Sequence, residues 1–310
     1  MNVCAVVVTY NRSELLKRCI KAILEQSKAV GTIIVVDNAS EIKASVVLKG
    51  VSRITHIRLE NNCGGAGGFN VGLNYAMKLG YDAAWLMDDD GAPEMTCLEM
   101  LTQGVESNDA IIVNPIVVDE TNHTALSFGI QCGFYATKSV SSARRHADRD
   151  GDVVGSINPF NGTLITRCVF STIGNIKSEC FIWGDEVEYI RRASRHGVRL
   201  ATRTKAIHYH PPQKESQRGI WPFNKVRLCP PDRSQFHFRN LGYNTMYYDG
   251  IMMVVSKYFL NFFAIYLYCS WSEAIKFHRY YIDGARDRYE LAPSRNYLTS
   301  RCAYSVISVD

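Results

Sequence analysis

Three consecutive aspartates, Asp88, Asp89 and Asp90, are the residues of this chain best suited to chemistry. They follow the apolar run 83–87, which predicts a buried strand. Adjacent carboxylates repel one another unless a cation compensates their charge. Side chains alternate along an extended segment, so Asp88 and Asp90 are expected on one side and Asp89 on the other. Oxygen ligands of this kind suit Mg²⁺ or Mn²⁺ bound with a diphosphate. The alternative is a solvated acidic turn that leads into a helix.

Polar segments also follow two earlier apolar runs. Residues 9–12 follow the run 3–9, and residues 37–40 follow the run 32–36. In an open parallel sheet, ligands bind at the carboxyl ends of the strands. Each segment alone is typical of a turn. Together with the three aspartates, they predict a single polar crevice.

Four glycines crowd the segment 64–68, which precedes Phe69 and Asn70. Glycine lacks a Cβ atom, so its backbone amides can approach a ligand closely. We therefore predict a glycine-rich loop over residues 61–68. It is not a dinucleotide fingerprint, because those glycines follow the first strand. A bare tight turn is the alternative, although such a turn needs only one or two glycines.

Acids open a later helix, and a histidine pair follows it. Asp185 and Glu186 begin a helical pattern that runs to His196, and a carboxylate there can serve as a proton acceptor. Ordinary helix capping is the alternative. His208 and His210 come after one more apolar segment. Imidazole is a common metal ligand, and the pair gains interest here only because the aspartates already predict a metal.

These side chains need a scaffold, and the chain predicts an α/β one. Apolar runs alternate with helical patterns along the first part of the chain. The apolar runs lie at 3–9, 32–36, 56–59 and 83–87. One helical pattern covers 13–26, where Ser13 is the expected N-cap, and another follows the glycine-rich segment and ends at about residue 78. Strands that alternate with helices imply a mostly parallel sheet covered on both faces. The polar, basic stretch 131–152 predicts a mobile surface loop or a hairpin.

Composition excludes several classes of protein. With 310 residues, 46% apolar and 21% charged, the chain is globular rather than disordered. A net charge of +5 is too mild to indicate a nucleic-acid partner without a basic patch. The ten cysteines form no Cys-x-x-Cys pair, which argues against a zinc ribbon or a disulfide framework. The N-terminus does not resemble a signal peptide, so we expect a cytoplasmic protein.

The composition shifts toward tyrosine and phenylalanine after about residue 215. We therefore predict a catalytic domain over 1–215 and a helical, aromatic-rich region over 216–310. Residues 251–270 are almost wholly apolar, but Lys257 and Asn261 interrupt them. This pattern favours a helix that lies at a membrane surface or is buried between domains over one that spans the bilayer. Nothing in the sequence predicts the oligomeric state.

Six motifs in this order and spacing resemble the inverting, GT-A-fold enzymes of glycosyltransferase family 2, across about residues 1–215. They are VTYNR, VVDNAS, NCGGAGGFNVG, WLMDDD, FIWGDEVEYIRRA and AIHYHP. The glycine segment followed by WLMDDD is most similar to bacterial galactofuranosyltransferases, with rhamnosyltransferases next. The resemblance implies a GT-A fold, which is a Rossmann-like, mostly parallel sheet with flanking helices.

The resemblance also implies roles for individual residues. Metal ligands would be Asp88, Asp90 and His210, with His208 as the alternative histidine, holding Mn²⁺ or Mg²⁺. The nucleotide sugar would be bound by Thr9, Asn11, Arg12, Asp37, Asp89 and, near its diphosphate and sugar, by Gly65, Gly67, Gly68 and Asn70. The catalytic base would be Glu186, and Asp185 is an alternative because the tryptophan of that motif is displaced by one residue, at Trp183.

The activity implied is transfer of galactofuranose from UDP-galactofuranose to a hydroxyl of a lipid-linked glycan acceptor, with inversion, on the inner face of the cell membrane. A rhamnosyltransferase that uses dTDP-rhamnose and a non-catalytic nucleotide-sugar binding protein are the alternatives. A nucleotidyltransferase is disfavoured, since it would carry a basic, glycine-rich signature near the first strand.

Overall fold

The computed structural model describes residues 1–133, 135–212, 217–220, 223–227, 229–289 and 302–308. Its contacts divide the chain into two compact units, which are described separately here. The first unit comprises Met1–Ile176, Arg192–Gln213 and Cys302–Asp310, and the second comprises Lys177–Arg191 and Lys214–Arg301. The predicted domain boundary at residue 215 lies outside the described residues.

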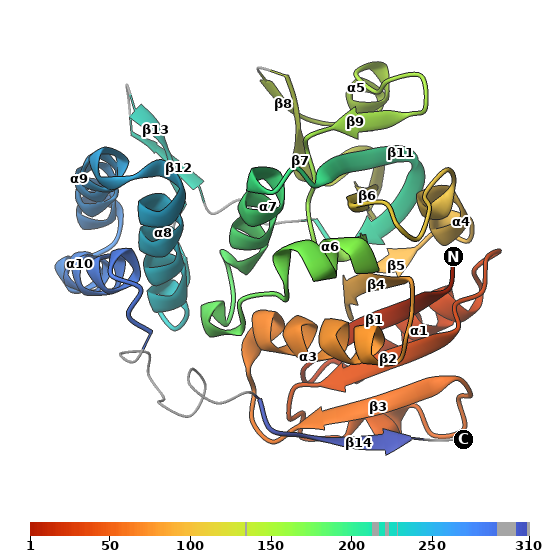
Figure 1. The fold of residues 1–310 in the computed structure, drawn as a ribbon. Coiled ribbons are helices and arrows are strands. Elements are labelled where there is room, and N and C mark those ends of the chain that lie inside the picture. Colours follow the sequence, from red (N-terminus) through yellow and green to blue (C-terminus); the bar gives the residue numbers. More distant parts are fainter. Residues whose placement is uncertain (134, 213–216, 221–222, 228, 290–301, 309–310) are drawn as a thin grey trace. The chain divides into compact units, whose positions relative to one another are not determined.

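Four parallel strands form the core of the first unit (Figure 1). They lie in the order β3-β2-β1-β4. The strand order reverses at β1, and in open α/β sheets such a switch point is where ligands bind. Val8 of β1 pairs with Asp88 of β4, and Thr9 pairs with Asp37 of β2. The carboxyl ends of three strands therefore meet, as predicted. The strands are β1 (Val3–Thr9), β2 (Thr32–Asp37), β3 (Ile54–Leu59) and β4 (Ala83–Asp88).

Beyond β4 the sheet is mixed. β10 runs antiparallel to both β4 and β6, and β11 runs parallel to β6. At the other edge, β14 pairs antiparallel with β3. The α/β class is confirmed, with parallel pairing among the first four strands and mixed pairing after them. The remaining strands are β5 (Ala92–Pro93), β6 (Ile111–Asp119), β7 (Asn122–Cys132), β8 (Tyr135–Ser139), β9 (Asp152–Val154), β10 (Asn161–Thr166), β11 (Arg199–His210) and β14 (Tyr304–Ser308).

Helices cover both faces of the parallel strands. Alternate residues of β1 point to opposite faces. Ala5 and Val7 belong to the core cluster that contains Leu16 and Ile20 of α1, whereas Val6 and Val8 lie against α3. Continuous β-branched runs therefore fit strands that are buried on both sides. The helices of this unit are α1 (Ser13–Leu24), α2 (Ala44–Val47), α3 (Gly64–Lys78), α4 (Cys97–Thr102), α5 (Val140–Arg145) and α6 (Arg167–Ile173).

The glycine-rich segment is a helix, so the predicted loop over 61–68 is wrong from residue 64 onward. A Cβ atom on Gly68 would lie 2.5 Å from Val8 Cγ1, and one on Gly72 would lie 2.3 Å from Val6 Cγ1. These glycines let α3 lie directly on β1. The predicted cap of α1 is also wrong, because the N-cap position is Arg12 and Ser13 is the first helical residue.

The stretch 131–152, predicted as a loop or a hairpin, contains both a hairpin and a helix. β7 and β8 pair antiparallel from Ala125↔Ser139 to Cys132↔Tyr135, and α5 follows directly. Ser139 caps α5, since its side chain accepts a hydrogen bond from the Ser142 amide. Polar composition alone did not reveal this helix.

The second unit is built on three helices, as the aromatic-rich composition predicts. Glycines bring α8 and α10 into backbone contact, because a Cβ on Gly242 would lie 2.1 Å from the Tyr281 carbonyl oxygen. Phe238, Phe277 and Tyr281 form its core. These helices are α8 (Ser234–Asp249), α9 (Ile251–Tyr268) and α10 (Trp271–Ala285). The unit also holds most of α7 (Asp185–Arg195) and a ladder of β12 (Gln217–Ile220) and β13 (Phe223–Arg227).

We predict that Gly72→Ala destabilises the protein by about 1–3 kcal/mol, because the new methyl group overpacks the contact between α3 and β1. Gly65→Ala is the matched control in the same helix. A Cβ there meets nothing within 4 Å, so this change should be neutral or stabilise by up to about 1 kcal/mol. Urea unfolding measures both. Equal effects would contradict the close helix–strand packing.

Candidate active site

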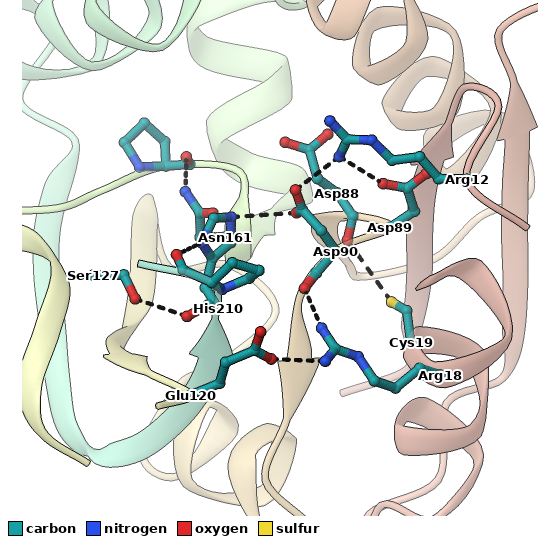
Figure 2. A network of polar contacts seen from close by, with 12 residues as sticks. Arg12, Arg18, Cys19, Asp88, Asp89, Asp90, Glu120, Ser127, Asn161 and His210 are labelled. Atoms are coloured by element: carbon teal, nitrogen blue, oxygen red, sulfur yellow. Dashed lines mark hydrogen bonds and ion pairs between the residues drawn. The ribbon is translucent and has the colours of Figure 1, made fainter. Parts of the chain in front are cut away.

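The acidic triplet is held by a threonine and an arginine from the end of β1. Thr9 Oγ1 donates to Asp89 Oδ2 at 2.7 Å. The Arg12 guanidinium donates to Asp89 Oδ1 at 3.2 Å and to Asp90 Oδ2 at 2.7 Å. Figure 2 shows Arg12 bridging the two carboxylates. Asp89 is therefore committed to bonds within the protein, while Arg12 supplies part of the positive charge that the triplet requires.

Electrostatics separate Asp88 from Asp90. Burial, together with the neighbouring charges of Asp90 and Asp89, raises the pKa of Asp88 to about 8. Burial also acts to raise the pKa of Asp90, but hydrogen bonds and charges from His210 and Arg12 lower it to about 2. Near neutral pH, Asp88 is therefore protonated and Asp90 is ionised, as expected for two carboxyl groups that lie close together.

His210 is the histidine that faces the aspartates. Its Nε2 lies 3.2 Å from Asp90 Oδ1, and its Nδ1 lies 2.7 Å from the Pro211 carbonyl oxygen. A carbonyl oxygen only accepts, so Nδ1 carries a proton. Burial acts to lower the pKa of the ring, but the hydrogen bond and the charge of Asp90 raise it above its ordinary value. Phe128 packs against the ring at 5.0 Å between centroids. These contacts hold Nε2 beside the Asp90 carboxylate (Figure 2).

His208 sits differently. Its side chain is fully buried, and neither ring nitrogen has a hydrogen-bond partner. The ring packs closely against Gly91 and Gly162. Burial and the nearby His210 lower its pKa to about 3, so it is neutral. Of the two predicted histidines, His210 has the contacts expected of a ligand, and His208 has those of a packed core residue.

The donor set fits a hard divalent cation. Asp90 Oδ1 is buried and has His210 Nε2 beside it at 3.2 Å, and no described residue donates a hydrogen bond to the Asp88 carboxyl group. Two carboxylates and one imidazole suit Mn²⁺ or Mg²⁺. Among the described residues, no group of three or more His, Cys, Asp or Glu side chains is arranged to hold a metal ion. Asp90 and His210 are in direct contact, and Asp88 lies beside Asp90, so a metal bound by these residues would need further ligands from outside the chain.

Asp37 and Asn11 organise the loops that follow β2 and β1. The Asp37 carboxylate accepts hydrogen bonds from the amides of Ser40, at 2.8 Å, and Ala44, at 3.0 Å, and from Arg58 at 2.6 Å. Asn11 has a φ of 55°, and its Oδ1 accepts from the Glu41 amide. Both residues therefore shape the end of the sheet that they were predicted to line. Arg58 was missed, because a single arginine in a strand carries no sequence signal.

Among the predicted glycine-segment residues, only Gly65 is open to a ligand. Nothing would contact a Cβ at Gly65, whereas Gly67 packs on Cys63 and Gly68 on Val8. Asn70 Nδ2 donates to the carbonyl oxygen of Ile176 at 2.6 Å. The structure thus gives Gly67, Gly68 and Asn70 packing and bracing contacts, and leaves the first turn of α3 accessible at Gly65.

Arg18 is a second residue that the sequence did not indicate. It extends from α1 and donates to the Asp90 carbonyl oxygen at 2.7 Å and to Glu120 Oε2 at 2.7 Å. It therefore ties the turn that carries Asp90 to the turn after β6 (Figure 2). Charged residues on an exposed helix face are common, so spacing alone could not distinguish Arg18 from its neighbours.

In the second unit, α7 (Asp185–Arg195) begins at the predicted acids. The preceding loop is held by Asn240, whose Nδ2 donates to the carbonyl oxygens of Cys180, Ile182 and Trp183. Phe181 and Trp183 have positive φ values of 62° and 58°. Side-chain-bearing residues rarely adopt this conformation, and such strain gathers at functional sites.

Glu186 and Asp185 differ in accessibility. Asp185 is buried. Glu186 is half-buried, and its Oε2 accepts a hydrogen bond from the Gly184 amide at 2.7 Å. No described residue donates to its Oε1. Glu186 therefore keeps one carboxylate oxygen available for a proton, whereas Asp185 is enclosed.

The reversed strand order, with an acidic pair and a histidine at its switch point, defines a GT-A fold. The glycosyl transferase family 2 profile matches residues 4–154. The chain is 31% identical over 266 residues to galactofuranosyltransferase GlfT1 of Mycolicibacterium smegmatis, which covers 84% of this chain and 88% of that protein. The chain belongs to glycosyltransferase family 2.

Two further likenesses extend the comparison. A dTDP-rhamnosyl transferase, RfbF of Shigella flexneri, is 23% identical over 77% of this chain and 78% of its own length. The crystal structure of GalNAc-T7 with UDP, GalNAc and Mn²⁺ is similar in fold, with a TM-score of 0.56 at 13% identity. The match covers 78% of this chain and 48% of the GalNAc-T7 chain.

We predict that Mn²⁺ affinity rises with pH up to about 8, the pKa of Asp88 in the metal-free protein. A cation needs the ionised carboxylate, so binding below that pH must displace a proton and weakens by up to about tenfold per unit of pH. Calorimetry in buffers of different ionisation enthalpy measures the proton released. Asp88→Asn should remove most of this release. A pH-independent affinity from pH 6 to 8 would contradict the assignment.

We predict that Arg18→Met weakens Mn²⁺ binding roughly tenfold, because the turn that carries Asp90 loses its anchor. Lys17→Met is the matched control, since Lys17 bonds only to the neighbouring Glu14 on the same exposed helix face. Calorimetric affinities are compared with urea unfolding of each variant. A loss of stability without any loss of Mn²⁺ affinity would assign Arg18 a purely structural role.

Proposed function

We propose that this protein is a metal-dependent, inverting galactofuranosyltransferase that takes its sugar from UDP-galactofuranose. The observation that carries the proposal is the gathering of Asp88, Asp90 and His210 at the switch point of the sheet. The GlfT1 relative, which matches over most of both chains, supports galactofuranose as the sugar. Sequence similarity over most of the chain indicates the sugar donor better than the fold does, because proteins with a GT-A fold use many different donors.

Asp88, Asp90 and His210 would hold Mn²⁺ or Mg²⁺. The bound ion would neutralise charge on the diphosphate of the donor. Mn²⁺ and UDP in the GalNAc-T7 structure support this assignment at the level of the fold. Arg12 is half exposed and already bridges two aspartates, which suits it to contact the diphosphate. Thr9, Asn11 and Asp37 would shape the wall for the nucleoside.

Glu186 would be the catalytic base. An acceptor hydroxyl oxygen attacks the anomeric carbon of the sugar, the bond from that carbon to the diphosphate oxygen breaks, and UDP departs with the bonding electrons. Glu186 takes the hydroxyl proton. One displacement inverts the anomeric configuration. The available Oε1 atom and the strained loop before α7 support Glu186 over the buried Asp185.

A second donor has support of its own. The rhamnosyltransferase RfbF is a more distant relative that matches over 77% of this chain, so dTDP-rhamnose is the alternative sugar donor. Incubation with UDP-galactofuranose, UDP-galactopyranose or dTDP-rhamnose and Mn²⁺, followed by measurement of the released nucleotide, separates the candidates. Release from none of them would favour a non-catalytic nucleotide-sugar binding protein.

The acceptor would be a lipid-linked glycan, and the protein would act as a peripheral protein on the inner face of the cell membrane. None of the described cysteines forms a disulfide bond, which suits a reducing compartment. The described part of the second unit also carries a helix, α9, that is long and apolar enough to cross a membrane. Both observations support a cytoplasmic enzyme that works close to lipid.

We predict that Glu186→Gln lowers transfer by about 10²- to 10⁴-fold, the usual contribution of a general base, while UDP affinity stays within about twofold of the wild type. Asp90→Asn should instead weaken the Mn²⁺-dependent binding of UDP. Radiolabel transfer to a soluble acceptor and calorimetry provide the two readouts. Glu25→Gln, at the exposed end of α1, is the control. Full turnover by Glu186→Gln would remove Glu186 from the role of base.

A further inference from the structure

We infer that the outer face of α9 and α10 is a docking surface for an anionic lipid bilayer, with α9 lying in the plane of the membrane. The surface itself is observed in the second unit alone. Its purpose rests on the proposed function, because a lipid-linked acceptor is presented at a bilayer surface. The exposed residues of α9 and α10 would contact the lipid, and the axis of α9 would lie parallel to the membrane surface.

A continuous apolar stripe runs along α9. Met252, Phe259, Phe263 and Leu267 are 84%, 54%, 57% and 65% exposed, and Val255 lies between the first two. Their spacing of three, four, four and four residues places them on one side of the helix. The stripe extends from the first turn to the last. Large exposed apolar patches of this kind mark protein or membrane contacts.

The opposite side of α9 is packed against its own bundle. Ala264 and Ile265 are buried, and the Tyr258 ring stacks on Phe277 of α10 at 5.8 Å between centroids. Lys257 forms an ion pair with Asp249 at 2.9 Å. Among the described residues, α9 is the helix long and apolar enough to cross a membrane, with 17% of it buried. Because one side is held by protein, we assign it an in-plane position.

The start of α10 continues the stripe. Trp271 is 58% exposed and Ile275 is 51% exposed. The Trp271 ring contacts Tyr266 of α9 edge-on at 5.6 Å, so the two helices present one joined surface. Tryptophan and tyrosine are favoured where a protein meets the headgroup region, because each ring joins an apolar body to a polar tip.

Charge favours an anionic partner. The two acids of α9 and α10 are withdrawn from the surface: Glu273 bonds to Ser234 and Lys276, and Asp283 is buried. Arg279, one turn beyond Ile275, is exposed. An apolar stripe bordered by a cation, without an exposed carboxylate on either helix, complements anionic headgroups over acyl chains. A second protein copy would bring its own cation against this one.

The test is sedimentation of the full chain with vesicles of phosphatidylcholine and phosphatidylglycerol. Wild-type protein should sediment, and Phe259→Asp/Phe263→Asp should lower partitioning at least about tenfold, because it places two charges in the apolar stripe. The control is Val46→Asp/Met95→Asp, which changes two apolar residues of similar exposure in the first unit and should sediment like the wild type.

A second variant tests the charge without touching the stripe. Arg279→Glu should weaken sedimentation with these vesicles, and added salt should weaken the wild type in the same way. Carbonate washing at high pH should release bound wild-type protein, as expected for in-plane contact. Retention after washing would overturn the in-plane position. Wild-type protein that stays in the supernatant would overturn the inference as a whole.

Two readouts separate this inference from its rivals. Light scattering after size exclusion would reveal a dimer that Phe259→Asp/Phe263→Asp dissociates, and that result would assign the face to a second copy instead. Nucleotide release with a soluble acceptor should be unchanged in the same variant. For the wild-type protein, normal catalysis without vesicle binding would overturn the docking surface alone, whereas vesicle binding without catalysis would overturn the proposed function alone.

Discussion

Crowded negative charge at the end of β4 is the constraint on which the first unit depends. Three carboxylates follow one another where the strand order reverses, and burial together with the charges of Asp90 and Asp89 raises the pKa of Asp88 to about 8. Thr9 and Arg12, at and just after the end of β1, and His210 of β11 lie beside these carboxyl groups and stabilise them. The arrangement keeps three carboxyl groups together because positive groups and hydrogen-bond donors lie beside them.

The rest of the first unit serves to keep that edge in register. Glycines let α3 lie directly on β1, while α1 covers the other face and extends Arg18 to the turn that carries Asp90. Asp37 closes the neighbouring loop by accepting three hydrogen bonds. Rigid support of this kind matters because a ligand misplaced by about 1 Å can lose most of its catalytic value.

The second unit combines a strained loop with an exposed apolar helix face. Its α8 uses Asn240 to hold the strained loop before Glu186, and its α9 leaves an apolar stripe uncovered. A soluble helical bundle usually turns such a stripe inward. One unit therefore contains both Glu186, which we propose as the catalytic base, and the apolar stripe, which we infer contacts lipid. An enzyme whose acceptor carries a lipid has reason to join the two.

The sequence by itself determined the parallel strands and the polar residues at their ends, because β-branched runs and acidic clusters are local patterns. Family membership followed from six motifs in order. Tertiary structure decided which of two histidines faces Asp90, since that depends on how β11 pairs with β6 across an irregular register. It also decided that the glycines belong to a helix and that Arg18 and Arg58 matter. Those facts arise from contacts between segments distant in the chain, which local periodicity does not encode.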